Sequence, residues 1–225
     1  LSGCIIKIDP TTKGIFTKNK SIRDGTHKVK HFKTSMVTQE GIKLVSYVYQ
    51  PKDLETSPTI LVRIPLTKTT GNSIKLAIIG RYWARMGYTA VIQTTRGMSE
   101  SSGEYYPLAF ERIDGKDTLT WLRGQPWYNG QIVMWGGSSF GQTQYVLMND
   151  LTGDIKTYFI QISSSSFYDM FFPGDAFSLE SALYWALKSY GGKDRNVRLS
   201  DLKRGVQALP IIHADDDAAA DIGFY

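Results

Sequence analysis

The sequence predicts an α/β fold, in which helices cover both faces of a mostly parallel sheet. Runs of strand-forming residues alternate with segments of helical periodicity along the chain. The strand runs are nearly continuously apolar, which is typical of strands buried on both faces. At 225 residues the chain is long enough for one domain with a substantial core. Right-handed crossovers between the parallel strands then fix how the sheet winds.

The predicted elements follow from the apolar runs and from the residues that begin and end them. The strands are expected at residues 43–49, 59–64, 88–93, 131–135 and 155–162. One helix is expected to begin at Asn72 or Ser73 and to end at Gly87. A second is expected over residues 114–122, and a helical run over residues 177–190 follows the last strand. Because no further parallel strand follows, the sheet is expected to be incomplete at its C-terminal side.

A serine pair stands between a predicted strand and a predicted helix. Residues 131–135 lead into Gly136-Gly137-Ser138-Ser139-Phe140-Gly141, and a helical run over residues 142–148 follows. Small neighbours allow a serine to sit on a strained strand-to-helix turn with its hydroxyl clear of the sheet, as in the nucleophile elbow of the α/β-hydrolase fold. The general pattern G-x-S-x-G fits Gly137 to Gly141 and selects Ser139.

Several ordered motifs lie between Thr59 and Asn149. They are R-I-P at 63–65, T-R-G-M-S-E-S-S-G-E at 95–104, D-G-K-D-T-L-T-W-L at 114–122 and Q-P-W-Y-N-G at 125–130. Together they resemble the X-Pro dipeptidyl-peptidase and cocaine-esterase-like (CocE/NonD) hydrolases. That family's elbow reads G-x-S-Y-x-G with T-Q after it. In this register Ser138 is the nucleophile, Ser139 takes the tyrosine's position, and Ser139 remains the alternative nucleophile.

The resemblance implies a serine hydrolase that cleaves amide or ester bonds through an acyl-enzyme on Ser138, without a cofactor. The backbone N–H of Ser139 would stabilise the oxyanion. The family's second oxyanion donor is a tyrosine hydroxyl in the turn after R-N-P, and Leu66 stands in its place here. Leucine offers no donor, so Leu66 is expected only to border the substrate, unless a shifted turn brings in Thr67. Thr94, where the family usually has aspartate, is interpreted as structural.

The remaining members of a Ser-His-Asp triad are expected after the serine, in the order acid and then histidine. The chain has three histidines. His27 and His31 precede the serine in a lysine-rich stretch and are interpreted as solvated loop residues. His213 lies in a segment that resembles the family's cap region, before the triad acid. The triad aspartate and histidine are therefore expected in a segment absent from this chain, which alone would be inactive.

Three explanations for the missing segment stay open: removal of the rest of the protein, its presence as a second chain, or a truncated paralogue. The first two explanations predict that the remainder of the protein or a second chain completes the sheet. They also predict that the substrate is a small ester or a short peptide. The third predicts a catalytically inactive, hydrolase-like binding or scaffold protein, which is the alternative function.

The domain organisation is expected to have three parts. Residues 1–33 form a basic arm, residues 34–165 the front part of the hydrolase core, and residues 166–225 the start of a helical cap. In the cap, Tyr184 and Trp185 either line the substrate pocket or fill a helical core. The acidic run at residues 215–217 suits a helix N-terminus better than a metal site, and no metal is expected.

Composition narrows the remaining function classes. The formal net charge of +5 is concentrated in the first residues, but no nucleic-acid-binding motif accompanies it, so nucleic-acid recognition is excluded. Cys4 is the only cysteine, which excludes an internal disulfide. Leu1-Ser2-Gly3-Cys4 matches the bacterial lipobox, with Cys4 as the lipidated residue. That match predicts a membrane tether in the cell envelope or periplasm; an ordinary Cys4 predicts a cytoplasmic protein.

Overall fold

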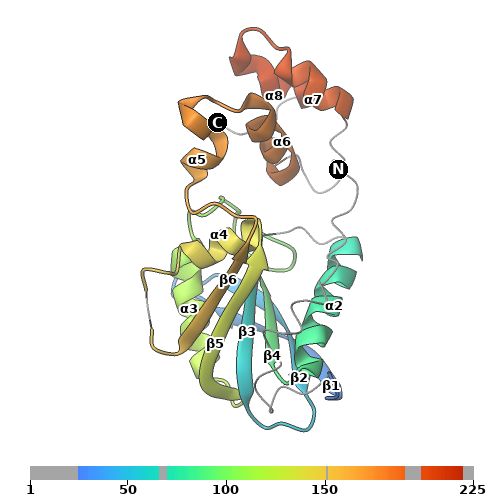
Figure 1. Cartoon of the computed structure of the whole chain (residues 1–225), viewed down its shortest axis with the longest axis vertical. Coiled ribbons are helices and arrows are strands. Elements are labelled where there is room, and N and C mark those ends of the chain that lie inside the picture. The colour runs from blue at the N-terminus through green and yellow to red at the C-terminus, as the bar shows by residue number, and fades with distance from the viewer. Residues whose placement is uncertain (1–24, 66–69, 151, 191–198, 220–225) are drawn as a thin grey trace. The chain divides into compact units, whose positions relative to one another are not determined.

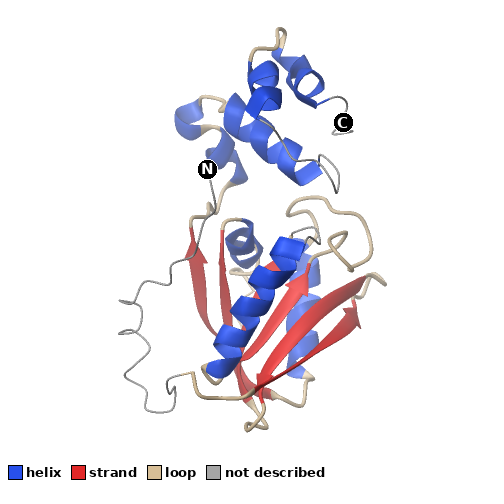
Figure 2. Cartoon of the chain, turned by 90° about the vertical axis from the view of Figure 1, so that its right-hand side faces the viewer, coloured by secondary structure: helices blue, strands red, loops and turns tan. Residues whose placement is uncertain are grey.

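The structure is a computed structural model that describes residues 25–65, 70–150, 152–190 and 199–219 (Figure 1). The chain divides into two compact units between Ser163 and Ser164. The first unit is α/β and the second is helical, as the colouring in Figure 2 shows. The division lies two residues before the expected boundary between core and cap at residues 165 and 166.

The first unit contains a mixed sheet with strand order β1-β2-β4-β3-β5-β6 (Figure 1). The β1/β2 and β2/β4 pairs are antiparallel, whereas the β3/β4, β3/β5 and β5/β6 pairs are parallel. The prediction of a mostly parallel sheet with helices is therefore confirmed. The strands are β1 Val29–Val37, β2 Lys43–Pro51, β3 Ser57–Ile64, β4 Thr89–Thr94, β5 Tyr128–Gly137 and β6 Ile155–Gln161.

Helices cover both faces of this sheet (Figure 2). On one face, Leu61 of β3 packs in a cluster with Leu119 and Leu122 of α3, which spans Glu111–Arg123. On the other face, Val62 packs with Trp83 of α2, which spans Thr70–Arg85. Successive residues of a strand point to opposite faces, so one nearly continuous apolar strand supplies both clusters.

The N-terminal strand β1 was not among the predicted strands. Its side chains are mostly exposed, because it lies at the edge of the sheet and pairs only with β2 in the described part of the chain. Such a strand lacks the apolar run by which buried strands are found. Residues 29–33 lie inside the range expected to be the basic arm, so the sheet begins before residue 34. His31 lies in β1 and stacks on Tyr49 at 5.7 Å, so interpreting His31 as a loop residue was wrong.

The helix starts differ from those predicted. Helix α2 begins at Thr70, before Asn72, and α3 begins at Glu111, before Asp114. Phe110 precedes α3 and provides no side-chain cap, so no capping residue marks this start in the sequence.

At the opposite edge, β6 pairs with β5 and with no other strand among the described residues. The strand ends at Gln161, and the next residue, Ile162, has a positive φ of 47° and is 89% exposed. Phe159 is 37% exposed on the same strand. This edge is therefore open in the described part of the chain.

The second unit has its own small core. Leu183, Leu187 and Leu202 are buried there, with Ala208, Ala214 and Ala218. The acidic run at residues 215–217 lies in the first turn of α8, so the helix N-terminus predicted for it is confirmed. The unit's elements are α5 Phe167–Phe171, η2 Pro173–Asp175, α6 Leu179–Tyr190, α7 Leu199–Val206, η3 Ile211–His213 and α8 Ala214–Ala219.

Candidate active site

Ser138 sits in a strained backbone conformation between β5 and α4, which spans Ser139–Tyr145. Its φ is 54° and its ψ is −129°, a region that non-glycine residues rarely occupy. Ser138 is exposed, whereas Ser139 is half-buried and is the first residue of α4. A strained serine presented on a strand-to-helix turn has the geometry of a nucleophile elbow. Of the two candidate serines, Ser138 is the one in this conformation.

Two glycines give the elbow the room it needs. A Cβ added to Gly136 would overlap the side chain of Phe140. A Cβ added to Gly141 would lie 2.7 Å from the Cβ of Ser163 and 2.8 Å from the Cγ2 of Ile160. The spacing of glycines in the sequence therefore reflects close packing of α4 against the ends of β5 and β6.

The backbone of Ser138 is bound on both sides. Its N–H donates to the carbonyl of Gln161, at the end of β6, at 2.9 Å. Its carbonyl accepts from the N–H groups of Gly141 and Gln142 at 2.9 and 3.2 Å. The N–H of Ser139 opens the first turn of α4, where backbone N–H groups have no acceptor within the helix. That N–H directly follows Ser138, at the position expected for the oxyanion donor.

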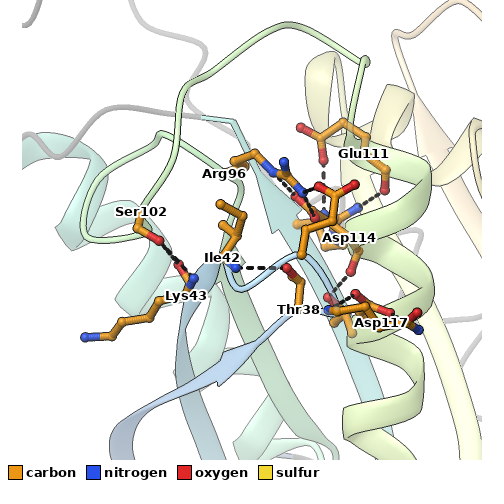
Figure 3. A network of polar contacts seen from close by, with 12 residues as sticks. Thr38, Ile42, Lys43, Arg96, Ser102, Glu111, Asp114 and Asp117 are labelled. Atoms are coloured by element: carbon orange, nitrogen blue, oxygen red, sulfur yellow. Dashed lines mark hydrogen bonds and ion pairs between the residues drawn. The ribbon is translucent and has the colours of Figure 1, made fainter.

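The loop after β4 is held by a buried ion pair. The guanidinium of Arg96 donates to both carboxylate oxygens of Asp114 in α3, at 2.7 and 3.1 Å (Figure 3). Glu40 lies 2.7 Å from the same guanidinium, and Phe110 lies under it at 4.1 Å from the ring centroid. The hydrogen bond that Arg96 donates to Asp114 is the main cause that raises the pKa of Arg96. The contacts of Arg96 therefore indicate a structural role.

Thr94, at the end of β4, is buried and its hydroxyl lies 2.6 Å from the hydroxyl of Ser101. Its Oγ1 also donates to the carbonyl of Val45 in β2 at 3.3 Å. These contacts join the loop to the N-terminal hairpin and agree with the structural interpretation of Thr94.

A second buried ion pair joins β3 to the first residue of α3. Arg63 is 1% exposed and donates to the side chain of Gln93 at 3.1 Å and to the carbonyl of Glu111 at 2.6 Å. Its Nη2 lies 3.1 Å from Oε2 of Glu111, an ion-pair contact without a well-directed hydrogen bond. Burial raises the pKa of Glu111, and the charge of Arg63 opposes that rise. Leu66 and Thr67, in the turn itself, lie outside the described residues.

The described histidines have other partners. Nδ1 of His27 lies 2.8 Å from a carboxylate oxygen of Asp53. Nδ1 of His213, an exposed residue of the second unit, lies 3.7 Å from Asp216. Within the first unit, no hydrogen bond joins His27 or His31 to Ser138 or Ser139 among the residues that the structure describes.

The two aromatic candidates of the second unit differ in environment. Trp185 is half-buried and its ring contacts Phe167 and Phe171 edge-on or tilted, at 5.1 and 5.7 Å between centroids. Tyr184 is 46% exposed. The core interpretation therefore fits Trp185 better than Tyr184.

Cys4 lies outside the described residues. In the part of the chain that is described, no helix has the length and apolar character to span a bilayer, and no group of histidine, cysteine and acidic side chains is arranged to hold a metal ion.

The sequence model of the X-Pro dipeptidyl-peptidase (S15) family matches residues 40–221. The chain belongs to this family. Both the resemblance drawn from the ordered motifs and the α/β-hydrolase fold are thereby confirmed. The family is described as that of the X-Pro dipeptidyl-peptidases, which are hydrolases.

Relatives of this S15-family chain are longer than it is. It is 32% identical over 156 residues to the cocaine esterase of Rhodococcus sp. (strain MB1 Bresler), a match that covers 66% of this chain and 26% of the esterase. The chain thus spans about a quarter of that relative. An aminopeptidase from a marine sediment Thaumarchaeota archaeon shares the fold, with a TM-score of 0.66 at 19% identity over 90% of this chain and 38% of the other.

The fold is also shared with the α/β hydrolase GrgF from Penicillium sp. sh18. The TM-score is 0.50 at 17% identity, over 60% of this chain and 46% of that one. Sequence identity this low shows a shared fold and nothing more specific.

Sequence reasoning missed two sets of buried polar contacts in the first unit. Glu111 was left outside the helix expected over residues 114–122, so its ion pair with Arg63 was not foreseen. Thr143 and Gln144 entered only as the T-Q of the resemblance, because the short helix that carries them is mostly polar and no pattern marks which of its polar side chains are buried.

Proposed function

We propose that the protein is a serine hydrolase that cleaves ester or amide bonds through an acyl-enzyme on Ser138. The observation that carries the proposal is the strained conformation of Ser138, whose side chain is exposed at the turn between β5 and α4. Backbone strain in a non-glycine residue persists only where the surroundings enforce it, and it gathers at functional sites. Ser139 has ordinary helical surroundings and is the weaker candidate.

In the proposed reaction, Oγ of Ser138 attacks the substrate carbonyl and its proton passes to a histidine base. The resulting oxyanion accepts a hydrogen bond from the N–H of Ser139. Collapse expels an alcohol or amine, which leaves with the proton from the histidine. Water then hydrolyses the acyl-enzyme and regenerates the serine.

The base and its carboxylate partner are proposed to come from outside the described residues. The described histidines of the first unit, His27 and His31, are not hydrogen-bonded to either serine, and the open edge at β6 offers further strands a place to pair. We propose that the remainder of the same protein, or a second chain, supplies them. This chain alone is then inactive towards substrate. The substrate is proposed to be a small ester or a short peptide.

A fluorophosphonate probe tests the proposal, because it forms a covalent adduct with an activated serine. The probe is applied to this chain and to the longest natural form that carries it, and the adduct is located by intact mass and peptide mapping. We expect labelling of the longer form that is lost in Ser138→Ala and kept in Ser139→Ala. Absence of labelling in the longer form would contradict the proposal and favour the binding or scaffold function.

A further inference from the structure

The helix that carries the elbow is too short to hold its own position. Helix α4 contains only Ser139–Tyr145, and isolated helices of such length are not stable in water. It nevertheless begins directly after Ser138, whose φ and ψ are strained. Contacts with the sheet must therefore fix both the helix and the strained residue.

One side chain of α4 reaches both sides of the elbow. Gln144 is 1% exposed, and its Nε2 lies 3.3 Å from the carbonyl of Gly136 and 3.2 Å from that of Phe140. These two residues stand two positions before and two positions after Ser138. The same Nε2 lies 3.2 Å from the carbonyl of Phe159 in β6. A single amide group thus joins β5, α4 and β6 around the serine.

The neighbouring residue ties the same helix to the next strand. Thr143 is fully buried, and its hydroxyl lies 2.9 Å from the carbonyl of Phe140 and 3.4 Å from the carbonyl of Arg63 in β3. Arg63 is itself held by Gln93 and Glu111. The hydroxyl therefore connects α4 to the end of β3, which leads into the turn after that strand.

The surroundings of Gln144 favour a donor. Three carbonyl oxygens face Nε2, so this position requires a donor with more than one hydrogen. A carboxylate there would face three acceptors, and an apolar side chain would leave the carbonyls of Gly136 and Phe159 without this donor. The –NH2 group of Gln144 has the reach and the polarity for this role, whereas its Oε1 is buried without a hydrogen-bond partner in the described part of the chain.

We propose that Gln144, assisted by Thr143, is a positioning residue that holds the Ser138 hydroxyl in its attacking geometry. This inference rests on the proposed function of Ser138. Gln144 is buried and acts through the backbone, so it takes no part in bond making or breaking. Its loss is expected to slow the chemical step and to leave substrate binding nearly unchanged.

Gln144→Met tests the inference, because methionine has a similar length and no donor. Gln125→Met is the matched control: Gln125 also donates from Nε2 to a backbone carbonyl, that of Trp121 at 2.9 Å, in the turn after α3. For the longest natural form, three quantities are measured: the fluorophosphonate labelling rate at Ser138, kcat and KM for p-nitrophenyl acetate, and the thermal midpoint. We expect Gln144→Met to lower the labelling rate and kcat roughly ten- to a hundredfold, with KM within about threefold of wild type.

A second pair of variants covers the case in which Gln144→Met does not fold. Thr143→Val removes the hydroxyl at nearly constant shape, and Thr143→Ser restores it. We expect Thr143→Val to lower the labelling rate and Thr143→Ser to recover most of it, at similar thermal midpoints.

The outcomes separate the two proposals. A labelled wild type together with unchanged rates in folded Gln144→Met, or with Thr143→Ser no faster than Thr143→Val, overturns the positioning role alone. A loss of rate in Gln125→Met as large as in Gln144→Met also overturns it, since the effect is then one of general stability. A wild type that is not labelled at Ser138 overturns the proposed function and this inference with it.

Discussion

Nη2 of Arg63 and Oε2 of Glu111 lie 3.1 Å apart inside the first unit, with side chains that are 0% and 5% exposed. Arg63 is the penultimate residue of β3 and Glu111 is the first residue of α3, so the pair joins a central strand to the helix that covers one face of the sheet. Removal of one buried charge leaves its partner unpaired in a medium that solvates it poorly, which costs far more than the pair itself contributes.

We therefore expect Glu111→Ala to lower the free energy of unfolding by about 3–5 kcal/mol. Urea denaturation measures this change. Arg112→Ala, which removes an exposed ion pair with Asp150 one residue further along α3, is the control and is expected to have little effect. Equal effects of the two variants would show that the burial of the Arg63–Glu111 pair has no special energetic role.

The lowered pKa of Asp154 makes the stability of the fold depend on pH in the acid range. The hydrogen bonds from Arg123, at 2.8 and 3.1 Å, are the main cause that holds the pKa of Asp154 well below its ordinary value of 3.8. A carboxylate with a depressed pKa in the folded state stabilises the fold above its unfolded pKa and loses this contribution as the pH falls towards its folded pKa.

Urea unfolding of wild type and Asp154→Asn measures this contribution at a series of pH values. We expect the difference between them to be constant near pH 6 and to shrink below about pH 4. In an Arg123→Met background the pH-dependent part of the difference should become smaller, since its largest cause is gone while Thr152 and Tyr128 still donate to Asp154. A difference that stays constant down to pH 2 would contradict the assignment.

Gly141 predicts a steric requirement at the elbow. In Gly141→Ala the new methyl group would meet Ser163 and Ile160 at under 3 Å, and both neighbours are packed at the end of β6. Overpacking of this kind costs roughly 1–3 kcal/mol, which thermal unfolding measures. Gly153→Ala is the control, because nothing lies within 4 Å of the added Cβ. A Gly141→Ala variant as stable as Gly153→Ala would argue against tight packing of α4.

The two aromatic residues of the second unit predict different phenotypes. Trp185→Ala removes ring contacts with Phe167 and Phe171 and is expected to destabilise the protein by about 2 kcal/mol. Tyr184→Ala alters a residue that is 46% exposed, and we expect it to leave the thermal midpoint nearly unchanged but to raise KM for an aryl ester. An unchanged KM would remove Tyr184 from the proposed substrate pocket.

Sequence reasoning succeeded where local chemistry alone decides the structure. The buried strands have continuous apolar runs, and the glycines around Ser138 predict a tight turn that larger residues would not permit. The fold and the strand-to-helix turn were accessible for these reasons, whereas the choice of Ser138 over Ser139 came from the resemblance to the family's elbow and stays a prediction. The strained φ of Ser138, however, emerged only with the contacts of Gln161, Gly141 and Gln144 in place.

The parts that sequence reasoning missed depend on contacts between distant residues. Strand β1 is recognisable only through its pairing with β2, since its exposed side chains give no apolar signal. The early start of α3 at Glu111 is supported by Arg63, which lies 48 positions earlier in the chain. Such partners are set by the topology of the sheet, which local periodicity does not encode.

The hydrogen bond from Ser138 to Gln161 gives the elbow a connection to the sheet's open edge. Edge strands fray more readily than central ones, and amide hydrogen exchange reports such local opening. The amide proton of Ser138 can leave for solvent only when the end of β6 lifts away. The exchange rate of the Ser138 amide proton therefore reports the local stability of that edge. A partner that stabilises β6 also stabilises the backbone of Ser138.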